Sequence, residues 1–284
     1  MKFIIKLTFV FILFTGCNQN NIEDSLLWKI EGDDIKTSYL FGTMHVIPKK
    51  DLRLKTKMIK SLHLSSLTVL EADLDNTSIV EGIVKLSIFD NDSIENYASK
   101  SELDILKKFF KENGGTPFSK LNKLKPFPLN STVTRICLGN NLASYEDELI
   151  KITKESGKEI EGLETPVDLI PIYTDTPFDE EIDEVIYTIT NIEKTRSFYQ
   201  KMIQFYTEEN IQELYNYTDN YFADRKNFKQ LLLDDRNKKW IPKIVNYSID
   251  QSVFYGVGAA HLAGENGLIN LLVQEGYRVT PILE

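Results

Sequence analysis

The stretch VFYGVGAAHLAGENGLINLLVQEGYRVTPIL, residues 253–283, contains the pattern that decides the fold. An apolar run ends at Gly258, and a glycine-rich turn that contains His261 follows it. Leucines at helical spacing come next, and Gly276 separates them from a second strand-like run. The pattern predicts a strand, a turn, a helix and a strand, with His261 near the carboxyl end of the first strand. In open α/β sheets, ligands bind at this end of the strands.

The same local pattern occurs once more, near the start of the chain. A short strand-like run, residues 37–41, is followed by Gly42-Thr43-Met44-His45. The sequence Gly-x-x-His therefore follows a predicted strand twice, in a chain that has only 3 histidines. The third, His63, lies in a helical pattern and is better explained as an exposed or hydrogen-bonded helix residue. We expect the fold to bring His45 and His261 together.

Composition and periodicity together predict the fold class. The chain has 284 residues, of which 42% are hydrophobic and 26% charged, as is typical of a globular protein with a full core. We predict an α/β (α+β) fold with a central mixed β-sheet flanked by helices and a helical insertion between the two Gly-x-x-His motifs. A single domain would span residues 26–284. The formal net charge is −9 and no basic surface is evident, so nucleic acid is excluded as a partner.

The N-terminus has the features of an export signal. Lys2 and Lys6 precede and interrupt an apolar stretch that runs to Phe14, and this stretch is too short to span a bilayer comfortably. The sequence Thr15-Gly16-Cys17 resembles a bacterial lipoprotein cleavage site, and this resemblance implies lipid attachment at Cys17. Residues 17–25 would then tether the domain to the membrane of the cell envelope, outside the cytoplasm. An ordinary signal or an uncleaved anchor is the alternative. The other cysteine, Cys137, is most simply a small buried apolar side chain.

Two predicted strands end in acidic residues. Glu71 interrupts the apolar run of residues 67–73, and a carboxylate there is costly to bury unless it is paired or bound to a metal. The alternative is a strand end that simply reaches water. In residues 160–166, Glu161 and Glu164 flank a glycine that would allow one carboxylate to point into a site.

Two imidazoles and one carboxylate form a common site for a divalent metal. Such a metal lowers the pKa of bound water and polarises a carbonyl group. Arg236 could hold an oxyanion with its planar guanidinium, although periodicity alone places Arg236 and Asn237 on the surface of a helix. The chain has no His-Glu-x-x-His, no Gly-x-Ser-x-Gly and no P-loop sequence, so it is not an ordinary zincin, α/β-hydrolase or P-loop protein.

The segments YLFGTMHV, residues 39–46, and VGAAHL, residues 257–262, resemble the TraB/GumN/Tiki family. The segments GLET, residues 162–165, and DRN, residues 235–237, match weaker landmarks of that family, and the resemblance extends from about Trp28 to the C-terminus. It implies a fold related to erythromycin esterases and haem-binding ChaN lipoproteins. It also implies a metal-dependent peptidase that favours manganese or cobalt, with zinc as a further candidate.

The resemblance also implies roles for individual residues. By matching position, His45, Glu71 and His261 would bind the metal, with Gly42 and Gly258 as the motif glycines. Glu164, Arg236 and Asn237 would surround that metal. The family often continues after GLET with acidic residues and Gln, whereas this chain has PVDL at residues 166–169. This departure leaves the role of Glu164 open.

These observations lead to one main hypothesis and two alternatives. The main hypothesis is an exported, lipid-anchored, metal-dependent hydrolase, a peptidase acting on extracytoplasmic peptides or proteins. The first alternative is a non-catalytic protein that sequesters a peptide signal or haem. The second is a metal-free esterase that uses a histidine as its general base.

Overall fold

The computed structural model describes residues 24–284, so the expected export signal, Cys17 and most of the expected tether lie outside the described residues. A mixed six-stranded sheet forms the centre of the molecule, in the order β6-β4-β7-β2-β1-β8. Its strands are β6 (Glu159–Glu164), β4 (Leu67–Ala72), β7 (Val253–Gly258), β2 (Ser38–Thr43), β1 (Leu27–Glu31) and β8 (Arg278–Pro281). Strands β6, β4, β7 and β2 are parallel, and β1 is antiparallel to both β2 and β8. The predicted α/β class with a mixed central sheet is confirmed.

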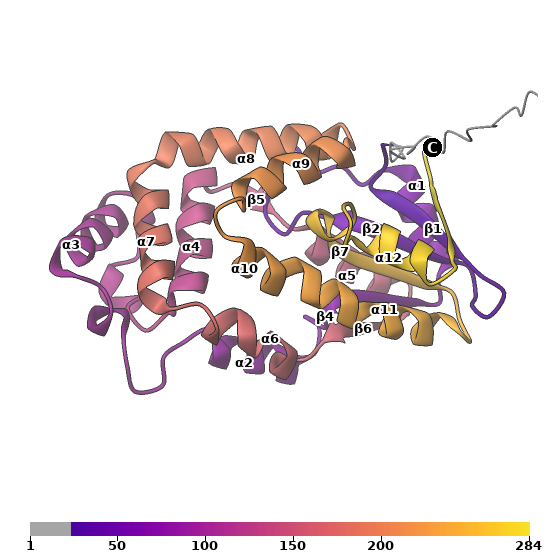
Figure 1. The fold of residues 1–284 in the computed structure, drawn as a ribbon, viewed down its shortest axis with the longest axis horizontal. Helices are drawn as coiled ribbons and strands as arrows, with labels where there is room; N and C mark the ends of the chain where they lie inside the picture. Colours follow the sequence, from indigo (N-terminus) through magenta and orange to yellow (C-terminus); the bar gives the residue numbers. More distant parts are fainter. Residues whose placement is uncertain (1–23) are drawn as a thin grey trace, which may run out of the picture.

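Helices cover the sheet and extend beyond it (Figure 1). In chain order they are α1 (Thr56–Leu64), α2 (Thr77–Leu86), α3 (Lys100–Phe109), α4 (Pro126–Leu138), α5 (Tyr145–Glu155), α6 (Pro166–Thr174), α7 (Phe178–Thr190), α8 (Ile192–Thr207), α9 (Ile211–Tyr221), α10 (Lys226–Lys229), α11 (Asp235–Ser248) and α12 (Leu268–Gln274). Two π-helical segments, η2 (Phe110–Gly114) and η4 (Gln230–Asp234), interrupt this series. A short ladder pairs β3 (Ile47–Pro48) with β5 (Leu142–Ala143).

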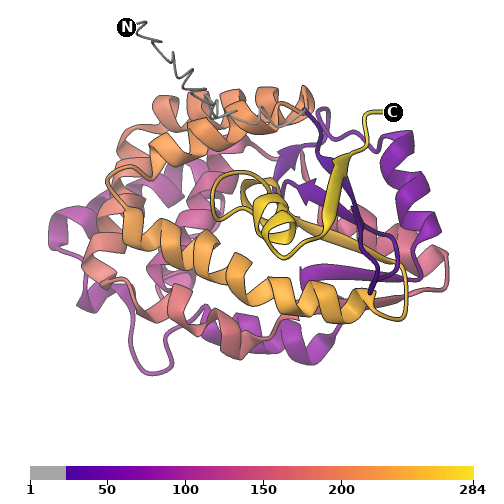
Figure 2. The ribbon, with the colours of Figure 1, turned by 45° about the vertical axis from the view of Figure 1, so that its right-hand side comes forward.

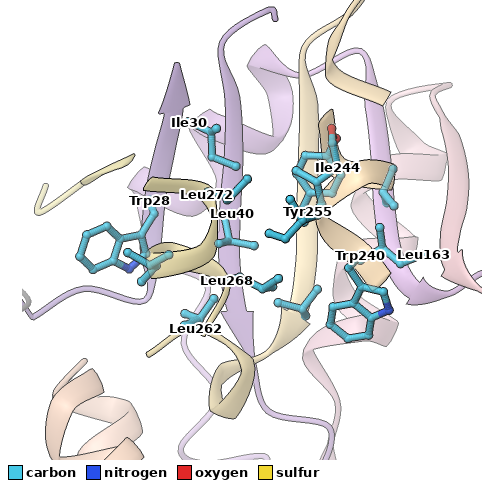
Figure 3. Close-up of a cluster of buried hydrophobic side chains, with 14 of the residues drawn as sticks. Trp28, Ile30, Leu40, Leu163, Trp240, Ile244, Tyr255, Leu262, Leu268 and Leu272 are labelled. Atoms are coloured by element: carbon cyan, nitrogen blue, oxygen red, sulfur yellow. The ribbon is translucent and has the colours of Figure 1, made fainter. Parts of the chain in front are cut away.

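Each face of the sheet has its own apolar core because successive strand residues point to opposite faces. Leu40 packs on one face with side chains of α11 and α12, among them Trp240 and Leu268 (Figure 3). Phe41, the next residue, packs on the other face with side chains from α1 and α5, such as Met58. Figure 2 shows α11 crossing the sheet with α12 beside it. The helix of the β-α-β pattern in residues 253–283, α12, therefore shares one outer layer with α11.

The helical insertion is split into two parts. Helices α2 to α4 lie between β4 and β5 in the chain, and α6 to α10 lie between β6 and α11. Helices α3, α4 and α7 form a lobe to the side of the sheet, on the left in Figure 1, with an apolar core of its own. Cys137 is buried in that core, as the sequence predicts. Among the described residues, no helix is long and apolar enough to cross a membrane.

Ser25 anchors the start of the described chain. This residue is fully buried, and its hydroxyl donates to the carbonyl oxygens of Leu27 and Ile282. The ammonium of Lys57 donates to the carbonyl of Ile282 and to the carboxylate of Glu209. The start and the end of the described chain are therefore held together at one edge of the sheet.

Candidate functional site

The carboxyl ends of four parallel strands bring the candidate residues to one edge of the sheet. In the ladders, Thr43 pairs with Gly258 and Ala72 pairs with Glu164. Glu71 lies on β4 directly before Ala72, and Glu164 is the last residue of β6. His45 follows β2, and His261 ends the 3-10 turn η5 (Ala259–His261) that follows β7. Residues distant in the sequence become neighbours because these strands are parallel and adjacent.

The structure places both motif histidines beside Glu71. Nε2 of His45 lies 3.5 Å from Oε1 of Glu71, and Nε2 of His261 lies 3.8 Å from the same oxygen. His261 is buried, whereas the side chain of His45 is 59% exposed. The two imidazoles therefore approach one carboxylate oxygen, one from the protein interior and one from the solvent side.

Gly258 leaves the space in which these three side chains meet. A Cβ atom at this position would lie 3.2 Å from Oε1 of Glu71, 3.4 Å from Nε2 of His45 and 3.5 Å from the ring of His261. The backbone N–H of Gly258 donates to Oε1 of Glu71 over 2.7 Å. The glycine of the second motif thus both orients the carboxylate and keeps the space beside it open.

His45 is oriented by Glu146, a residue that the sequence analysis did not identify. Nδ1 of His45 donates to Oε1 of Glu146 over 2.8 Å, and Glu146 also accepts from the hydroxyls of Thr43 and Ser144. Desolvation opposes protonation of the ring, but the charges of Glu146 and then Glu71 outweigh it and raise the pKa of His45 to about 9. Loss of that proton would leave the lone pair on Nε2, which faces Glu71.

His261 is oriented by Asn237. Nδ2 of Asn237 donates to the carbonyl oxygens of His261 and Asn266, so its Oδ1 accepts the hydrogen on Nδ1 of His261, over 2.7 Å. Burial lowers the pKa of His261 to about 3, and the charge of Arg236 acts in the same direction. His261 is therefore neutral near pH 7, with the lone pair on Nε2.

Arg236 connects the two glutamates that end β4 and β6. Its Nε donates to Glu164 over 2.9 Å, and its Nη2 donates to Glu164 over 2.7 Å and to Glu71 over 2.6 Å. Nη1 lies 3.3 Å from Nε2 of His261. Burial raises the pKa of Glu71, but the charge of Arg236, together with the neighbouring histidines and the N–H of Gly258, holds that pKa well below its usual range.

The surface position that periodicity predicts for Arg236 and Asn237 is wrong. These residues are 8% and 2% exposed. Charged and amide side chains are buried when every polar group has a partner, and here the partners are Glu71, Glu164 and His261. Periodicity could not show these partners, because they come from three other elements. The π-helical segment η4 ends directly before this turn of the helix, and such segments are frequent at functional sites.

The charges at this site do not balance. Glu71, Glu146 and Glu164 are largely buried; Glu71 and Glu164 contact the single guanidinium of Arg236, whereas Glu146 contacts His45. If the three carboxylates are ionised, they leave two negative charges that only a protonated histidine or a bound cation can offset. The raised pKa of His45 is one consequence of this imbalance. The site therefore favours a cation beside Glu71.

The types of donor atom at this site suit a divalent metal, and their spacing is close to that of a metal site. One carboxylate oxygen and two imidazole nitrogens form an ordinary set of metal ligands. Each ring also donates from Nδ1 to a neighbouring side chain, as metal-binding histidines usually do. The Nε2 atoms of His45 and His261 lie 3.5 and 3.8 Å from Oε1 of Glu71. Two ligand atoms of a tetrahedral metal, with bonds of about 2.1 Å, lie about 3.4 Å apart. Within residues 24–284, no group of three or more His, Cys, Asp or Glu side chains already has the arrangement of a metal site. Binding would require each Nε2 to move closer to Oε1 of Glu71, by a few tenths of an ångström at most.

The remaining candidates lie apart from this site. His63 is exposed on α1 and Cys137 is buried in the helical lobe. Glu161 is exposed on β6, so of the two glutamates around Gly162 only Glu164 points into the site. Glu146 was missed because it stands in the acidic first turn of α5, where negative charge is common for a different reason.

Comparison with known proteins gave one match. The model of the TraB/PrgY/gumN family matches residues 26–281, which is nearly the whole described domain. No curated protein and no solved structure matches the chain. The relationship to the erythromycin esterase and ChaN folds stays a prediction.

Proposed function

Because the chain belongs to the TraB/PrgY/gumN family, we propose that it is a metal-dependent hydrolase that cleaves peptides or proteins outside the cytoplasm. One observation carries this proposal. Two largely buried carboxylates contact one guanidinium, a third contacts His45, and two imidazoles present their Nε2 atoms to the same oxygen of Glu71. This arrangement has the excess negative charge and the nitrogen and oxygen donors that a divalent cation requires.

In this proposal, His45, His261 and Glu71 hold the metal, which would be manganese, cobalt or zinc. When bound, such a metal lowers the pKa of water and polarises a carbonyl oxygen. Glu146 and Asn237 keep the Nε2 atoms of the two rings directed at the site, since each accepts the hydrogen on Nδ1. The lowered pKa of Glu71 keeps its carboxylate ionised at neutral pH, as a ligand requires.

Arg236 and Glu164 have different roles in this site. Both oxygens of Glu164 accept hydrogen bonds from Arg236, so we assign Glu164 the role of positioning the guanidinium and not that of a proton carrier. Nη1 of Arg236 is 3.3 Å from Nε2 of His261 and therefore lies beside the proposed metal ligands. From there the guanidinium can stabilise negative charge that develops on a substrate oxygen.

Metal binding by the purified protein tests this proposal. After treatment with a chelator, the protein is titrated with Mn²⁺, Co²⁺ and Zn²⁺ in a calorimeter. His45→Ala and His261→Ala should each abolish binding of the metal that the unmodified protein takes up. His63→Ala is the matched control, because it removes the third histidine from an exposed position on α1. Unchanged binding in both site variants contradicts the proposal.

Cleavage is tested separately from metal binding. The metal-loaded protein is incubated with a peptide library, and the products are identified by mass spectrometry. New peptide termini that disappear with His261→Ala support a peptidase. Intact peptides that remain bound to the protein would instead support the sequestering alternative.

A metal-free hydrolase is a second candidate, and the contact between His45 and Glu146 favours it. An exposed imidazole that donates from Nδ1 to a buried carboxylate has the orientation of a general acid or base. Activity that persists in excess chelator and is lost in Glu146→Gln would select this candidate. Activity that disappears with the chelator and returns with added metal would exclude it.

We also propose export and lipid attachment at Cys17, on the basis of the sequence of residues 1–17. Cells fed with a labelled fatty acid should incorporate label into the protein. Cys17→Ser should abolish the labelling and release the protein from the membrane fraction. Labelling that persists in this variant contradicts the proposal.

A further inference from the structure

We propose that Trp240 is a positioning residue of the candidate site, and that its indole holds the ring of His261 and the guanidinium of Arg236 in place. Trp240 lies on α11 and is fully buried. Its ring centroid lies 4.5 Å from that of His261, with an angle of 38° between the two planes. Cζ of Arg236 lies 4.8 Å from the centroid of the Trp240 ring. One buried indole therefore contacts both a proposed metal ligand and the cation beside that ligand.

Helical spacing directs three side chains of α11 at His261. Arg236, Asn237 and Trp240 share one face of this helix, because residues three and four positions apart are neighbours on a helix surface. Nη1 of Arg236 lies 3.3 Å from Nε2 of His261, and Oδ1 of Asn237 accepts from Nδ1 over 2.7 Å. Trp240 packs against the imidazole ring itself. The helix therefore contacts both nitrogens of His261 as well as its ring.

The contact with Trp240 fixes the direction of Nε2. A hydrogen bond tolerates a range of angles, so the bond from Nδ1 to Asn237 alone would let the imidazole rotate about its Cβ–Cγ bond. A ring packed against the imidazole restricts this rotation, because buried side chains are closely packed and a rotated ring would collide with the indole. Nε2 of His261 thus stays directed toward Oε1 of Glu71, which lies 3.8 Å away.

The indole also stabilises the charge of Arg236. A guanidinium over the face of a tryptophan is attracted by the π electrons, and this attraction is stronger where water is excluded. The side chain of Arg236 is 10% exposed, so the contact is largely desolvated. A divalent cation bound to Nε2 of His261 would repel the guanidinium, whose Nη1 lies beside that nitrogen. The indole and Glu164 together would keep the guanidinium in place against this repulsion.

The other tryptophan of the chain is held in a different way. Trp28 is 3% exposed and belongs to the same apolar core, on the left of Figure 3, with Trp240 on the right. Nε1 of Trp28 donates to the carbonyl of Ser25 over 2.8 Å. Nε1 of Trp240 has no hydrogen-bond partner among residues 24–284, so its contacts with the site are made by the ring. Trp28 has the same side chain in the same core and is therefore the matched control for Trp240.

Calorimetry with metal tests this inference, which in this experiment rests on the proposed metal site. Trp240→Leu should weaken binding of the metal about tenfold, as loss of a contact that orients a ligand typically does. Trp240→Phe keeps an aromatic ring and should remain within about threefold of the unmodified protein. Trp28→Leu should leave the affinity unchanged, although it removes the same ring from the same core. Trp240→Met takes the place of Trp240→Leu if the leucine variant does not fold.

NMR of the metal-free protein tests the positioning of His261 independently of the metal. The chain has 3 histidines, so the imidazole signals can be assigned by replacing each histidine with alanine in turn. In the unmodified protein, in Trp240→Phe and in Trp28→Leu, His261 should show the single tautomer with its hydrogen on Nδ1. In Trp240→Leu the second tautomer should also appear, because a rotated ring loses its hydrogen bond to Asn237.

The two measurements separate this inference from the proposed function. If the unmodified protein binds no metal, the proposed function fails, and the tautomer of His261 still decides the role of Trp240. The inference is overturned if Trp240→Leu binds the metal as the unmodified protein does, or if His261 keeps a single tautomer in that variant. It is also overturned if Trp28→Leu or Trp240→Phe weakens metal binding as much as Trp240→Leu does.

Discussion

Nδ1 of His45 lies 2.8 Å from Oε1 of Glu146, although 101 positions separate these residues in the sequence. Glu146 is buried at the start of α5, whereas His45 is exposed in the loop after β2. A buried carboxylate thus determines the orientation of an exposed ring at the candidate site. It also accepts from Thr43, a residue of the first Gly-x-x-His motif. The side chain of Glu146 therefore joins the first Gly-x-x-His motif to helix α5.

The charge of Glu146 should control the properties of His45. Glu146→Gln retains a side chain of the same shape but removes the charge, so the pKa of His45 in metal-free protein should fall from about 9 toward the ordinary histidine value of 6.5. Loss of such a supporting contact typically lowers metal affinity about 10- to 100-fold. NMR titration of the imidazole and calorimetry with metal measure the two effects. Asp147→Asn, an exposed neighbour on the same helical turn, is the control, and equal effects of both substitutions would contradict this role.

Substitution of the two motif glycines should have different effects, on metal binding at Gly258 and on stability at Gly42. In Gly258→Ala, the backbone has a φ of −53° that alanine accepts, but the new methyl group would lie 3.2 Å from Oε1 of Glu71. We expect the fold to persist and metal binding to fall. In Gly42→Ala, the methyl group would lie 2.6 Å from Cδ1 of Leu262, so about 1–3 kcal/mol of stability should be lost through overpacking. Denaturant titration and metal calorimetry on both variants separate these outcomes, and similar stability losses would disprove the distinction.

Arg236 should be sensitive even to a substitution that keeps its charge. Arg236→Lys places one ammonium where a planar guanidinium now contacts both Glu71 and Glu164. At least one carboxylate would lose its partner, and breaking a buried pair costs about 3–5 kcal/mol. Urea denaturation measures the change in the free energy of unfolding. Lys238→Gln, at an exposed position on α11, should change this value by less than about 0.5 kcal/mol. An Arg236→Lys protein as stable as the unmodified one would contradict the proposed role.

Glu181 should make stability depend on pH far from the candidate site. It is 4% exposed, and burial raises its pKa to about 7 despite the nearby backbone N–H of Phe127 and the charges of Arg225 and Lys125. Between pH 4.5, the ordinary pKa of a glutamate, and about pH 7, the folded protein holds a proton that the unfolded chain releases. The contribution of Glu181 to stability is therefore present below the lower value and is lost as the pH rises through about 7.

Glu181→Gln should remove this dependence. The variant should be more stable than the unmodified protein at pH 8, by up to about 3 kcal/mol, and similar to it at pH 4.5. Thermal and urea unfolding at both pH values measure the difference. Glu180→Gln changes the exposed neighbouring carboxylate and is the control. A difference between the variant and the unmodified protein that is the same at both pH values would exclude titration of Glu181 as the cause.

Local patterns in the sequence predicted the strands, the turns after them and the residues at their ends. Gly258 and His261 follow an apolar run, and Glu71 interrupts another, so their places at strand ends could be inferred from their neighbours alone. The same reasoning failed for Arg236 because helical periodicity ranks a charged residue as exposed, without information on what lies opposite. It passed over Glu146 because acidic residues in the first turn of a helix have an electrostatic explanation that needs no site.

By itself, the sequence determined an α/β domain with two Gly-x-x-His turns and a small set of acidic strand ends. These features depend on side-chain periodicity and backbone preference over a few residues. Only the tertiary structure decided that β4, β7 and β2 lie side by side, that Arg236 joins Glu71 to Glu164, and that Glu146 supports His45. Such contacts depend on the order of strands and the packing of helices, which is set by the free energy of burying the whole core and not by any single segment.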